Sequence, residues 1–541
     1  MDAAPPPVGP LATGTLTARF LRGLARSPDR PAVRAAGEVR TYRELHERAL
    51  LLAGSLLAAT PAAAEAGADP ASGSAPGPAA IGVLAGSGPS AYAALLAGLY
   101  TGTTIVPLQP AFPAARTARM IEAAGVGALI AGDDTGPALT ALHEHGVRLP
   151  TLHPPGGSPQ PPVPVDPDSA LKEPLPVRPD AVEYVLFTSG STGRPKGVPV
   201  THANTAHYFG LLDARYDFGP EDVFSQTFDL NFDCAVFDLF CAWGAGARLV
   251  APPARAYARL PEFIADEGLT VWFSTPSAIA LVRRTGRLTP GALPSLRWSL
   301  FAGEALTRRD AEDWAAAAPA ARLENLYGPT ELTITVAAHP LRPEDAAHPT
   351  VPIGTVHPGH EVLLLDADGA PTGGDEGELC VAGPQATPGY LDPADDTGRF
   401  LDHAGHRHYR TGDRVRRLPD GALLYLGRQD SQVQVRGVRV ELGEVDAAVR
   451  GCAGVEDAVT VAVPAGDTVD LAVFHTGAPV PAADLARALR AVLPAAVVPR
   501  AYHHLDTFPL NPNRKIDRRL LAARAVDLAR PTGAPARQES Q

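Results

Sequence analysis

The feature of this sequence that most limits its fold is a repeated alternation of short apolar runs with helical patterns. The pairs are AIGVLA with PSAYAALLAGLY, GARLVAP with LPEFIADEG, LTVWFS with PSAIALVRR, and LRWSLFAG with RRDAEDWAAAA. A strand that leads into a helix and then into another strand makes a parallel βαβ unit. The sequence therefore predicts an α/β fold with mainly parallel sheets.

The pattern changes twice farther along the chain. From about residue 361 it becomes strand and turn, as in EVLLLDADGAPTGGDEGELCVAG, where the Asp-Gly pair indicates a hairpin. After residue 430 it becomes a short α+β segment that ends in an amphipathic helix, AADLARALRAVL. Because 541 residues exceed one compact core, we predict a large N-terminal domain over 1–429, a small C-terminal domain over 430–528 and a disordered tail over 529–541.

Two segments have the composition of surface loops. Residues 58–80 and 153–180 are rich in Pro, Gly, Ala and Ser, which punctuate regular structure and cannot fill a core. We expect both to be insertions between elements.

The charge balance argues against a general nucleic-acid surface. The chain carries 59 acidic and 47 basic residues, for a formal net charge of -12, whereas phosphate backbones are bound by clustered positive charge. A local pocket for a small anionic substrate is still compatible with this balance.

Cysteine spacing and hydropathy indicate a reduced protein without a membrane segment. Cys234, Cys241, Cys380 and Cys452 show no CxxC spacing, so we expect buried thiols and no zinc site. No apolar run approaches the roughly 20 residues of a membrane helix, and the N-terminus lacks a signal-peptide core. We therefore expect a cytoplasmic protein.

The stretch YVLFTSGSTGRPKGVPVTHAN, residues 184–204, has the composition of a phosphate-binding loop. Glycines allow backbone N–H groups to approach a polyphosphate, hydroxyls add donors, and an ammonium adds a point charge. An ordinary flexible turn is the alternative, and the spacing does not match a Walker loop. The residues concerned are Thr188, Ser189, Gly190, Ser191, Thr192, Gly193, Lys196 and Gly197.

This stretch closely resembles the phosphate loop of the adenylate-forming superfamily, which includes nonribosomal peptide adenylation domains, acyl-CoA synthetases and luciferases. The other motifs of that family are matched in order. They are LYTGTTIVPLQP at 99–110, LENLYGPTELT at 323–333, GELCVAGPQATPGYLDP at 377–393, YRTGD at 409–413, LGRQDSQVQVRGVRVELGEVD at 426–446 and PLNPNRKID at 509–517. The resemblance implies a small barrel-like β part and a mobile C-terminal domain.

The resemblance also implies roles in binding ATP and Mg²⁺. Glu331 would bind Mg²⁺ that bridges the phosphates, Tyr327 would stack on adenine, and Asp413 would accept hydrogen bonds from the ribose with Arg428 nearby. Taken singly, a surface acid, a core tyrosine and a turn aspartate are the ordinary alternatives. The remaining implied ATP-site residues are Gly303, Glu304, Asn325, Gly328 and Thr330, with Asn325 and Gly328 lining both the base and the amino-acid sites.

Lys515 is the residue that the resemblance marks as catalytic. Only Lys172, Lys196 and Lys515 among the 47 basic residues are lysines, which argues against a merely solvated basic run. In the family this lysine reaches the substrate carboxylate and ATP, then leaves as the small domain rotates about a hinge that corresponds to Asp430. Arg514 stands where a glycine is usual, and Gln434 where a lysine is frequent.

The stretch FDLNFDCAVFDLF at 228–240 suggests that the activated acid is an amino acid. It resembles the family segment whose aspartate pairs with an α-ammonium, and Asp233 matches that aspartate. A helix N-cap is the alternative, but a buried carboxylate without a cationic partner is energetically costly.

Carrying the family pocket onto this chain gives an apolar site that favours a small neutral side chain such as alanine. Leucine, valine or isoleucine stay open, as does chirality, because stand-alone D-alanine ligases are also similar. The pocket residues are Asp233, Cys234, Phe237, Phe273, Leu300, Ala302, Leu326, Ile334, Thr335 and Lys515.

The implied activity is that of a monomeric ligase acting on a separate partner. It would form aminoacyl-AMP and pyrophosphate, then load the phosphopantetheine thiol of a separate carrier protein, because no Gly-Gly-x-Ser type attachment site is found. Coenzyme A as acceptor, an acyl- or aryl-CoA ligase, and a catalytically silent carrier-docking protein are the alternatives.

Overall fold

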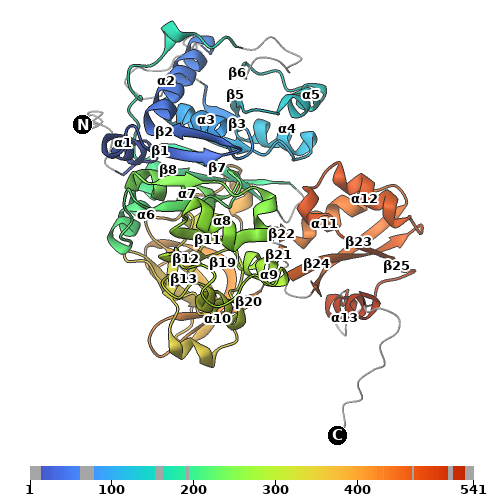
Figure 1. Cartoon of the computed structure of the whole chain (residues 1–541). Helices are drawn as coiled ribbons and strands as arrows, with labels where there is room; N and C mark the ends of the chain where they lie inside the picture. The colour runs from blue at the N-terminus through green and yellow to red at the C-terminus, as the bar shows by residue number, and fades with distance from the viewer. Residues whose placement is uncertain are drawn as a thin grey trace. The chain divides into compact units, whose positions relative to one another are not determined.

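The computed structural model describes residues 14–60, 78–152, 163–190, 194–429, 432–435, 437–465, 468–509 and 516–529. The chain divides into two compact units (Figure 1). The first comprises Met1–Thr188 and Lys196–Gln429, and the second comprises Ser189–Pro195 and Asp430–Gln541. Each unit has its own apolar core.

The first unit contains a six-stranded, mainly parallel sheet among its described residues. Its strands are β3 (Ala80–Leu84), β4 (Thr104–Leu108), β5 (Val126–Ala131), β6 (Thr151–Leu152), β7 (Val182–Thr188) and β8 (Lys196–Thr201). They lie in the order β6-β5-β3-β4-β7-β8, and only the β7–β8 pair is antiparallel.

A nine-stranded sheet is the second framework of this unit within the described ranges. Its strands are β1 (Pro31–Ala35), β2 (Glu38–Thr41), β9 (Val223–Ser225), β10 (Arg248–Val250), β11 (Val271–Ser274), β12 (Trp298–Phe301), β13 (Arg322–Tyr327), β14 (Ala337–Pro340) and β15 (Thr355–Val356). The order is β15-β14-β13-β12-β11-β9-β10-β1-β2, with antiparallel pairs only toward the two edges. The predicted α/β fold with mainly parallel sheets is confirmed.

Helices α3 (Pro89–Tyr100) and α7 (Asp233–Ala245) are buried on nearly all sides. Their side chains share one core cluster with Ile105 of β4 and Phe273 of β11, and so with strands of both sheets. A helix that is apolar all round must be enclosed, and neither sequence has a polar face. The beginning of α7 is therefore held in place by the main core.

The first unit has further helices among its described residues, of which α8, α9 and α10 complete the predicted strand-and-helix pairs. They are α1 (Leu16–Arg26), α2 (Tyr42–Ala59), α4 (Ala114–Ala123), α5 (Gly136–Glu144), α6 (His202–Arg215), α8 (Leu260–Glu267), α9 (Ser277–Arg284) and α10 (Arg308–Ala317).

A five-stranded antiparallel sheet follows, where strand and turn were predicted. Its strands are β16 (Glu361–Leu365), β17 (Glu376–Ala382), β18 (Phe400–His403), β19 (His406–Arg417) and β20 (Leu423–Arg428). The β16–β17 pair is the predicted hairpin. The core of this sheet includes Leu332 and Val336, so it supports the segment that follows β13.

The second unit is built around the sheet β23-β24-β25. Figure 1 shows α11 and α12 on one face and α13 on the other, and a separate apolar cluster lies on each face. Consecutive residues of β23, such as Ala458 and Val459, enter different clusters, because successive side chains of a strand point to opposite faces. The elements are β21 (Gln432–Val435), β22 (Val438–Glu441), α11 (Leu442–Arg450), β23 (Val455–Ala465), β24 (Thr468–Gly477), α12 (Ala482–Arg490), β25 (Ala501–His504) and α13 (Arg518–Ala529).

One predicted surface loop is partly wrong. Residues 61–77 and 153–162 lie outside the described residues, but the rest of the second loop packs against the main core through Val163, Val165 and Leu171. Backbone bonds to the flanking elements, such as Leu171 N–H to the Leu50 carbonyl, hold it there. The prediction of a surface loop rested on the high Pro and Gly content and overlooked these three apolar side chains.

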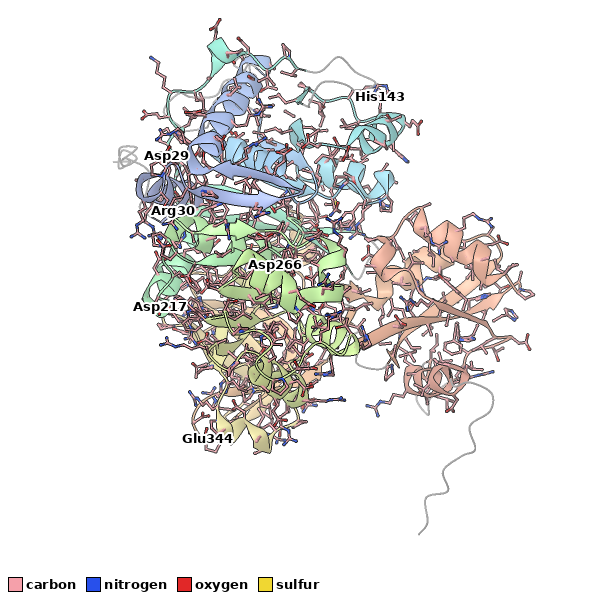
Figure 2. All side chains as sticks on the ribbon, in the orientation of Figure 1. Asp29, Arg30, His143, Asp217, Asp266 and Glu344 are labelled. Carbon is pink, nitrogen blue, oxygen red and sulfur yellow. The ribbon has the colours of Figure 1, made fainter. Side chains whose placement is uncertain are left out.

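Asp29, Arg30 and Asp217 are charged side chains at the periphery of the first unit, as Figure 2 shows. All four cysteines are free thiols; Cys241 and Cys380 are buried, whereas Cys234 and Cys452 are only half-buried. Within the described ranges, no helix combines the length and the apolarity needed to cross a bilayer.

Candidate active site

Asp233 is the first residue of α7 and lies in a buried position. Its side chain does not cap the helix, because Phe232 occupies the N-cap, so the N-cap alternative is wrong. Burial raises the pKa of Asp233 to about 6, while hydrogen bonds from the Thr330 hydroxyl and from backbone N–H groups oppose that rise. Its Oδ2 atom has no hydrogen-bond partner among the described residues. A buried oxygen in this state is suited to a cationic ligand group.

The floor next to Asp233 is apolar and tightly packed. The Phe237 and Phe273 rings have centroids 4.8 Å apart. Phe273 and Leu300 are register partners on the parallel strands β11 and β12. The structure gathers the following predicted pocket residues in the main core, where Cys234 is half-buried and the rest are buried: Cys234, Phe237, Phe273, Leu300, Ala302, Leu326 and Ile334.

The segment Thr333–Thr335 forms one wall with unusual backbone geometry. Thr333 and Ile334 have φ angles of 55° and 69°, in the left-handed region that β-branched residues rarely enter. The Thr335 hydroxyl is 2.9 Å from the hydroxyl of Tyr208 on α6. A Cβ atom at Gly328 would lie 2.6 Å from the Thr335 Cα atom. The glycine of the YGPTE motif is therefore required so that this wall can approach β13 closely.

Tyr327, Asp413 and Arg428 form one hydrogen-bonded group. The Tyr327 hydroxyl donates to Asp413 Oδ2 at 2.5 Å, and Arg428 donates to Asp413 Oδ1 at 2.7 Å. Asp413 and Arg428 are register partners on β19 and β20. The structure thus brings together the three residues that the sequence assigned to the nucleoside.

Lys196 and Glu331 both interact with Tyr390, a residue that was not among the predicted site residues. The Lys196 ammonium is 3.6 Å from Asp395 Oδ1 and 5.3 Å from the centre of the Tyr390 ring. The Tyr390 hydroxyl donates to Glu331 Oε1 at 2.6 Å. Tyr390 and Asp395 both lie in or just after the GELCVAGPQATPGYLDP motif, which was the signal for them.

The phosphate loop is described only at its ends. Thr188 ends β7 opposite Lys196, the first residue of β8. Ser189 belongs to the second unit, where its hydroxyl donates to the Arg439 carbonyl and accepts from the Glu441 N–H. Gly190 is buried. The predicted residues that lie outside the described ranges are Ser191, Thr192, Gly193, Asp430, Arg514 and Lys515.

Two other predicted ATP-site residues have structural partners. The Asn325 amide donates to the carbonyls of Val351 and Pro352, so its nitrogen is committed to the backbone rather than to a ligand. Glu304 accepts from the Ser277 N–H at the beginning of α9. Gly303 has a φ of 87°, which favours glycine.

The residues fit a metal that is held mainly by phosphates. Glu331 is buried, but the described residues contain no group of three or more His, Cys, Asp or Glu side chains placed to hold a metal. Mg²⁺ is usually bound through one or two carboxylates together with substrate phosphates. A single carboxylate beside a lysine is compatible with that mode.

Comparisons with known proteins identify one matching family and several similar proteins. The family described as AMP-binding enzyme matches residues 20–391. An L-proline--[L-prolyl-carrier protein] ligase of Pseudomonas fluorescens is 36% identical over 367 residues, covering 66% of this chain and 72% of the ligase.

Two solved structures are similar over nearly the whole chain. The crystal structure of IdnL7 is 51% identical with a TM-score of 0.72, covering 95% of this chain and 99% of IdnL7. The Vibrio cholerae adenylation domain AlmE, in complex with glycyl-adenosine-5'-phosphate, is 26% identical with a TM-score of 0.82, covering 96% of this chain and 99% of AlmE.

Proposed function

The chain belongs to the AMP-binding enzyme family, and from this premise we propose that it activates a small neutral α-amino acid with ATP and transfers it to a carrier protein. The observation that carries the proposal is the carboxylate of Asp233, buried above an apolar floor with Oδ2 without a hydrogen-bond partner among the described residues. An α-ammonium group would satisfy that oxygen. A fatty or aryl acid would leave it unpaired at considerable cost.

The first half-reaction joins the amino acid to AMP. A carboxylate oxygen of the substrate attacks the α-phosphorus of ATP, the bond to the β-phosphate oxygen breaks, and pyrophosphate leaves. Both reactants are anions, so the site must neutralise charge and hold them in line. Lys515 and Lys196 are the proposed cations for this step.

The nucleotide would be held by groups of the first unit. Tyr327 offers an aromatic face for adenine, and Asp413, already oriented by Arg428, offers acceptors for ribose hydroxyls. Glu331 would hold Mg²⁺ together with the phosphates, and the ion would supply further charge neutralisation.

The substrate side chain is proposed to be small and neutral. Phe237 and Phe273 take up much of the floor, and no acid or base among the predicted pocket residues other than Asp233 and Lys515 faces a side chain. The similar ligase of Pseudomonas fluorescens acts on proline, and the structure of AlmE holds a glycyl group. Proline and glycine should therefore be tested together with alanine.

The second half-reaction transfers the aminoacyl group to a thiol. The thiolate sulfur attacks the carbonyl carbon of aminoacyl-AMP, and AMP leaves. The prolyl-carrier ligase supports a carrier protein as the acceptor, with phosphopantetheine providing the sulfur. Rotation of the C-terminal unit about Asp430 is proposed to separate the two half-reactions.

Exchange of labelled pyrophosphate into ATP tests the first half-reaction. Exchange should depend on alanine, glycine or proline and should be lost in Lys515→Ala, while that variant should still transfer preformed aminoacyl-AMP to a carrier. If none of the amino acids in a full panel supports exchange, but acids that lack an amine do, the protein would instead be an acyl- or aryl-CoA ligase.

A further inference from the structure

We propose that Gln385 is a positioning residue that fixes the Ile334–Thr335 wall of the amino-acid pocket without touching the substrate. Gln385 follows β17 and is fully buried. Its two Nε2–H groups are shared among three carbonyl oxygens of the segment that forms this wall. They belong to Leu332 at 3.0 Å, Thr333 at 3.1 Å and Thr335 at 2.9 Å.

The segment needs such an anchor because its backbone is strained. Thr333 and Ile334 are consecutive β-branched residues with φ angles of 55° and 69°. Such conformations persist only where the surroundings over-determine them. The carbonyls on the two sides of Ile334, those of Thr333 and Thr335, belong to no helix or strand that would pair them. The Gln385 amide provides their hydrogen bonds.

The anchor is held in one orientation. The Thr333 hydroxyl donates back to the Gln385 carbonyl at 2.6 Å. The Gln385 Oε1 atom lies 3.3 Å from Nδ1 of His357. Since an amide oxygen can only accept, His357 carries its hydrogen on Nδ1, and burial keeps this ring neutral by lowering its pKa to about 4.

Helix α6 ties the anchor and the wall to the same support. The Asn204 amide donates to the carbonyls of Pro384 and Ala386, on either side of Gln385. Tyr208, one turn later, contacts the Thr335 hydroxyl. The wall is thus fixed at its backbone by Gln385 and at its side chain by Tyr208, and the position of Ile334 beside the substrate follows from both.

The test uses Gln385→Met, which keeps the side-chain volume but removes both the amide nitrogen and the amide oxygen. In pyrophosphate exchange, the KM for the amino acid should rise about tenfold or more, because a small displacement of a positioning contact is costly, while the KM for ATP should change less than about twofold. The matched control is Thr387→Val in the same segment, which loses the buried hydroxyl contacts to the Pro199 and Gly389 carbonyls but keeps the backbone hydrogen bond from the Thr387 N–H to the Glu331 carbonyl. That control should lower thermal stability and leave both KM values unchanged.

The proposed role of Gln385 in the amino-acid pocket rests on the proposed function. Hydrogen exchange gives a readout that needs no substrate and so tests the anchoring of the wall separately. In Gln385→Met, the peptide that spans residues 330–336 should take up deuterium faster than in the wild type and in Thr387→Val. If Gln385→Met does not fold, Gln385→Glu keeps the Oε1 acceptor and should raise uptake in the same peptide. Unchanged uptake, or equal rises in the KM for ATP and for the amino acid, would overturn the proposal. If no amino acid supports pyrophosphate exchange by the wild-type protein, that result would contradict the proposed function but not the anchoring role of Gln385.

Discussion

Two buried carboxylates of the first unit differ in how completely they are paired. Asp413 on β19 accepts from Tyr327 on one oxygen and from Arg428 on the other. Asp233 at the beginning of α7 has an oxygen with no hydrogen-bond partner among the described residues, and burial raises its pKa. The difference teaches that the protein itself orients Asp413, whereas the proposed function leaves Asp233 to be paired by an α-ammonium group of the substrate.

The strongest way to break this comparison is Asp233→Asn. Loss of the carboxylate should lower kcat/KM for the amino acid at least about a hundredfold, because a buried ion pair is lost. Stability should not fall and should rise by up to about 2 kcal/mol, since a desolvated charge is removed. Pyrophosphate exchange and chemical denaturation measure the two effects.

Asp238 on the same helix provides the matched control for this change. It is also buried; its Oδ2 atom accepts from the Thr227 N–H, and its Oδ1 atom, like Oδ2 of Asp233, has no hydrogen-bond partner among the described residues. Asp238→Asn should leave the KM for the amino acid unchanged. A similar loss of activity in both variants would mean that the helix, not the charge of Asp233, matters.

Asp413→Asn should have the opposite effect on stability. The change leaves Arg428 without its carboxylate, so the free energy of unfolding should fall by about 2 kcal/mol. The KM for ATP should rise about tenfold through the lost ribose contact, while the KM for the amino acid stays constant. Denaturation curves that match the wild type would show that Asp413 is not preorganised in this way.

The pH dependence of amino-acid use sharpens the comparison further. Asp233 must be ionised to pair with an ammonium, and its pKa is raised to about 6. Below that pH, kcat/KM for the amino acid should fall about tenfold per pH unit, and Asp233→Asn should remove this dependence. Because the native state binds the proton more tightly than the unfolded chain, this group's destabilising contribution should fade as pH falls from 6 toward 4.

A third buried carboxylate, Glu331, gives the smallest predicted effect. Tyr390→Phe removes one donor to Glu331 and should raise the Mg²⁺ concentration for half-maximal exchange about fivefold, as expected for one lost hydrogen bond. The control Tyr92→Phe loses a buried bond to Gln226 and should leave the Mg²⁺ dependence unchanged. Equal Mg²⁺ curves for all three proteins would contradict a positioning role for Tyr390.

Sequence was informative where a residue's role follows from its own local pattern. Apolar runs predicted β11, α9 and the enclosed helix α3, because alternation and periodicity are local properties. The family resemblance assigned Tyr327 and Asp413, in motifs that lie 86 positions apart, to one nucleoside, and the structure joins the two residues by a hydrogen bond.

The roles of Gln385, Tyr390 and the Asn325 amide could not be predicted in the same way. Each depends on which carbonyl or carboxylate the fold brings within 3 Å, as when Gln385 meets a carbonyl 50 residues away. Composition gives no information about such pairings. The strained φ angles of Thr333 and Ile334 are equally invisible, since threonine and isoleucine ordinarily indicate strands.

The floor of the pocket is continuous with the main core, and this links substrate range to thermal tolerance. Phe237 and Phe273 are among the most deeply enclosed side chains of the unit. Replacing either by alanine to admit a larger substrate would remove about 3–5 kcal/mol of stability through the cavity that it leaves. That is a large share of the roughly 5–15 kcal/mol that holds a typical domain folded. Evolution or engineering toward bulkier amino acids would therefore have to begin with stabilising changes elsewhere in the unit.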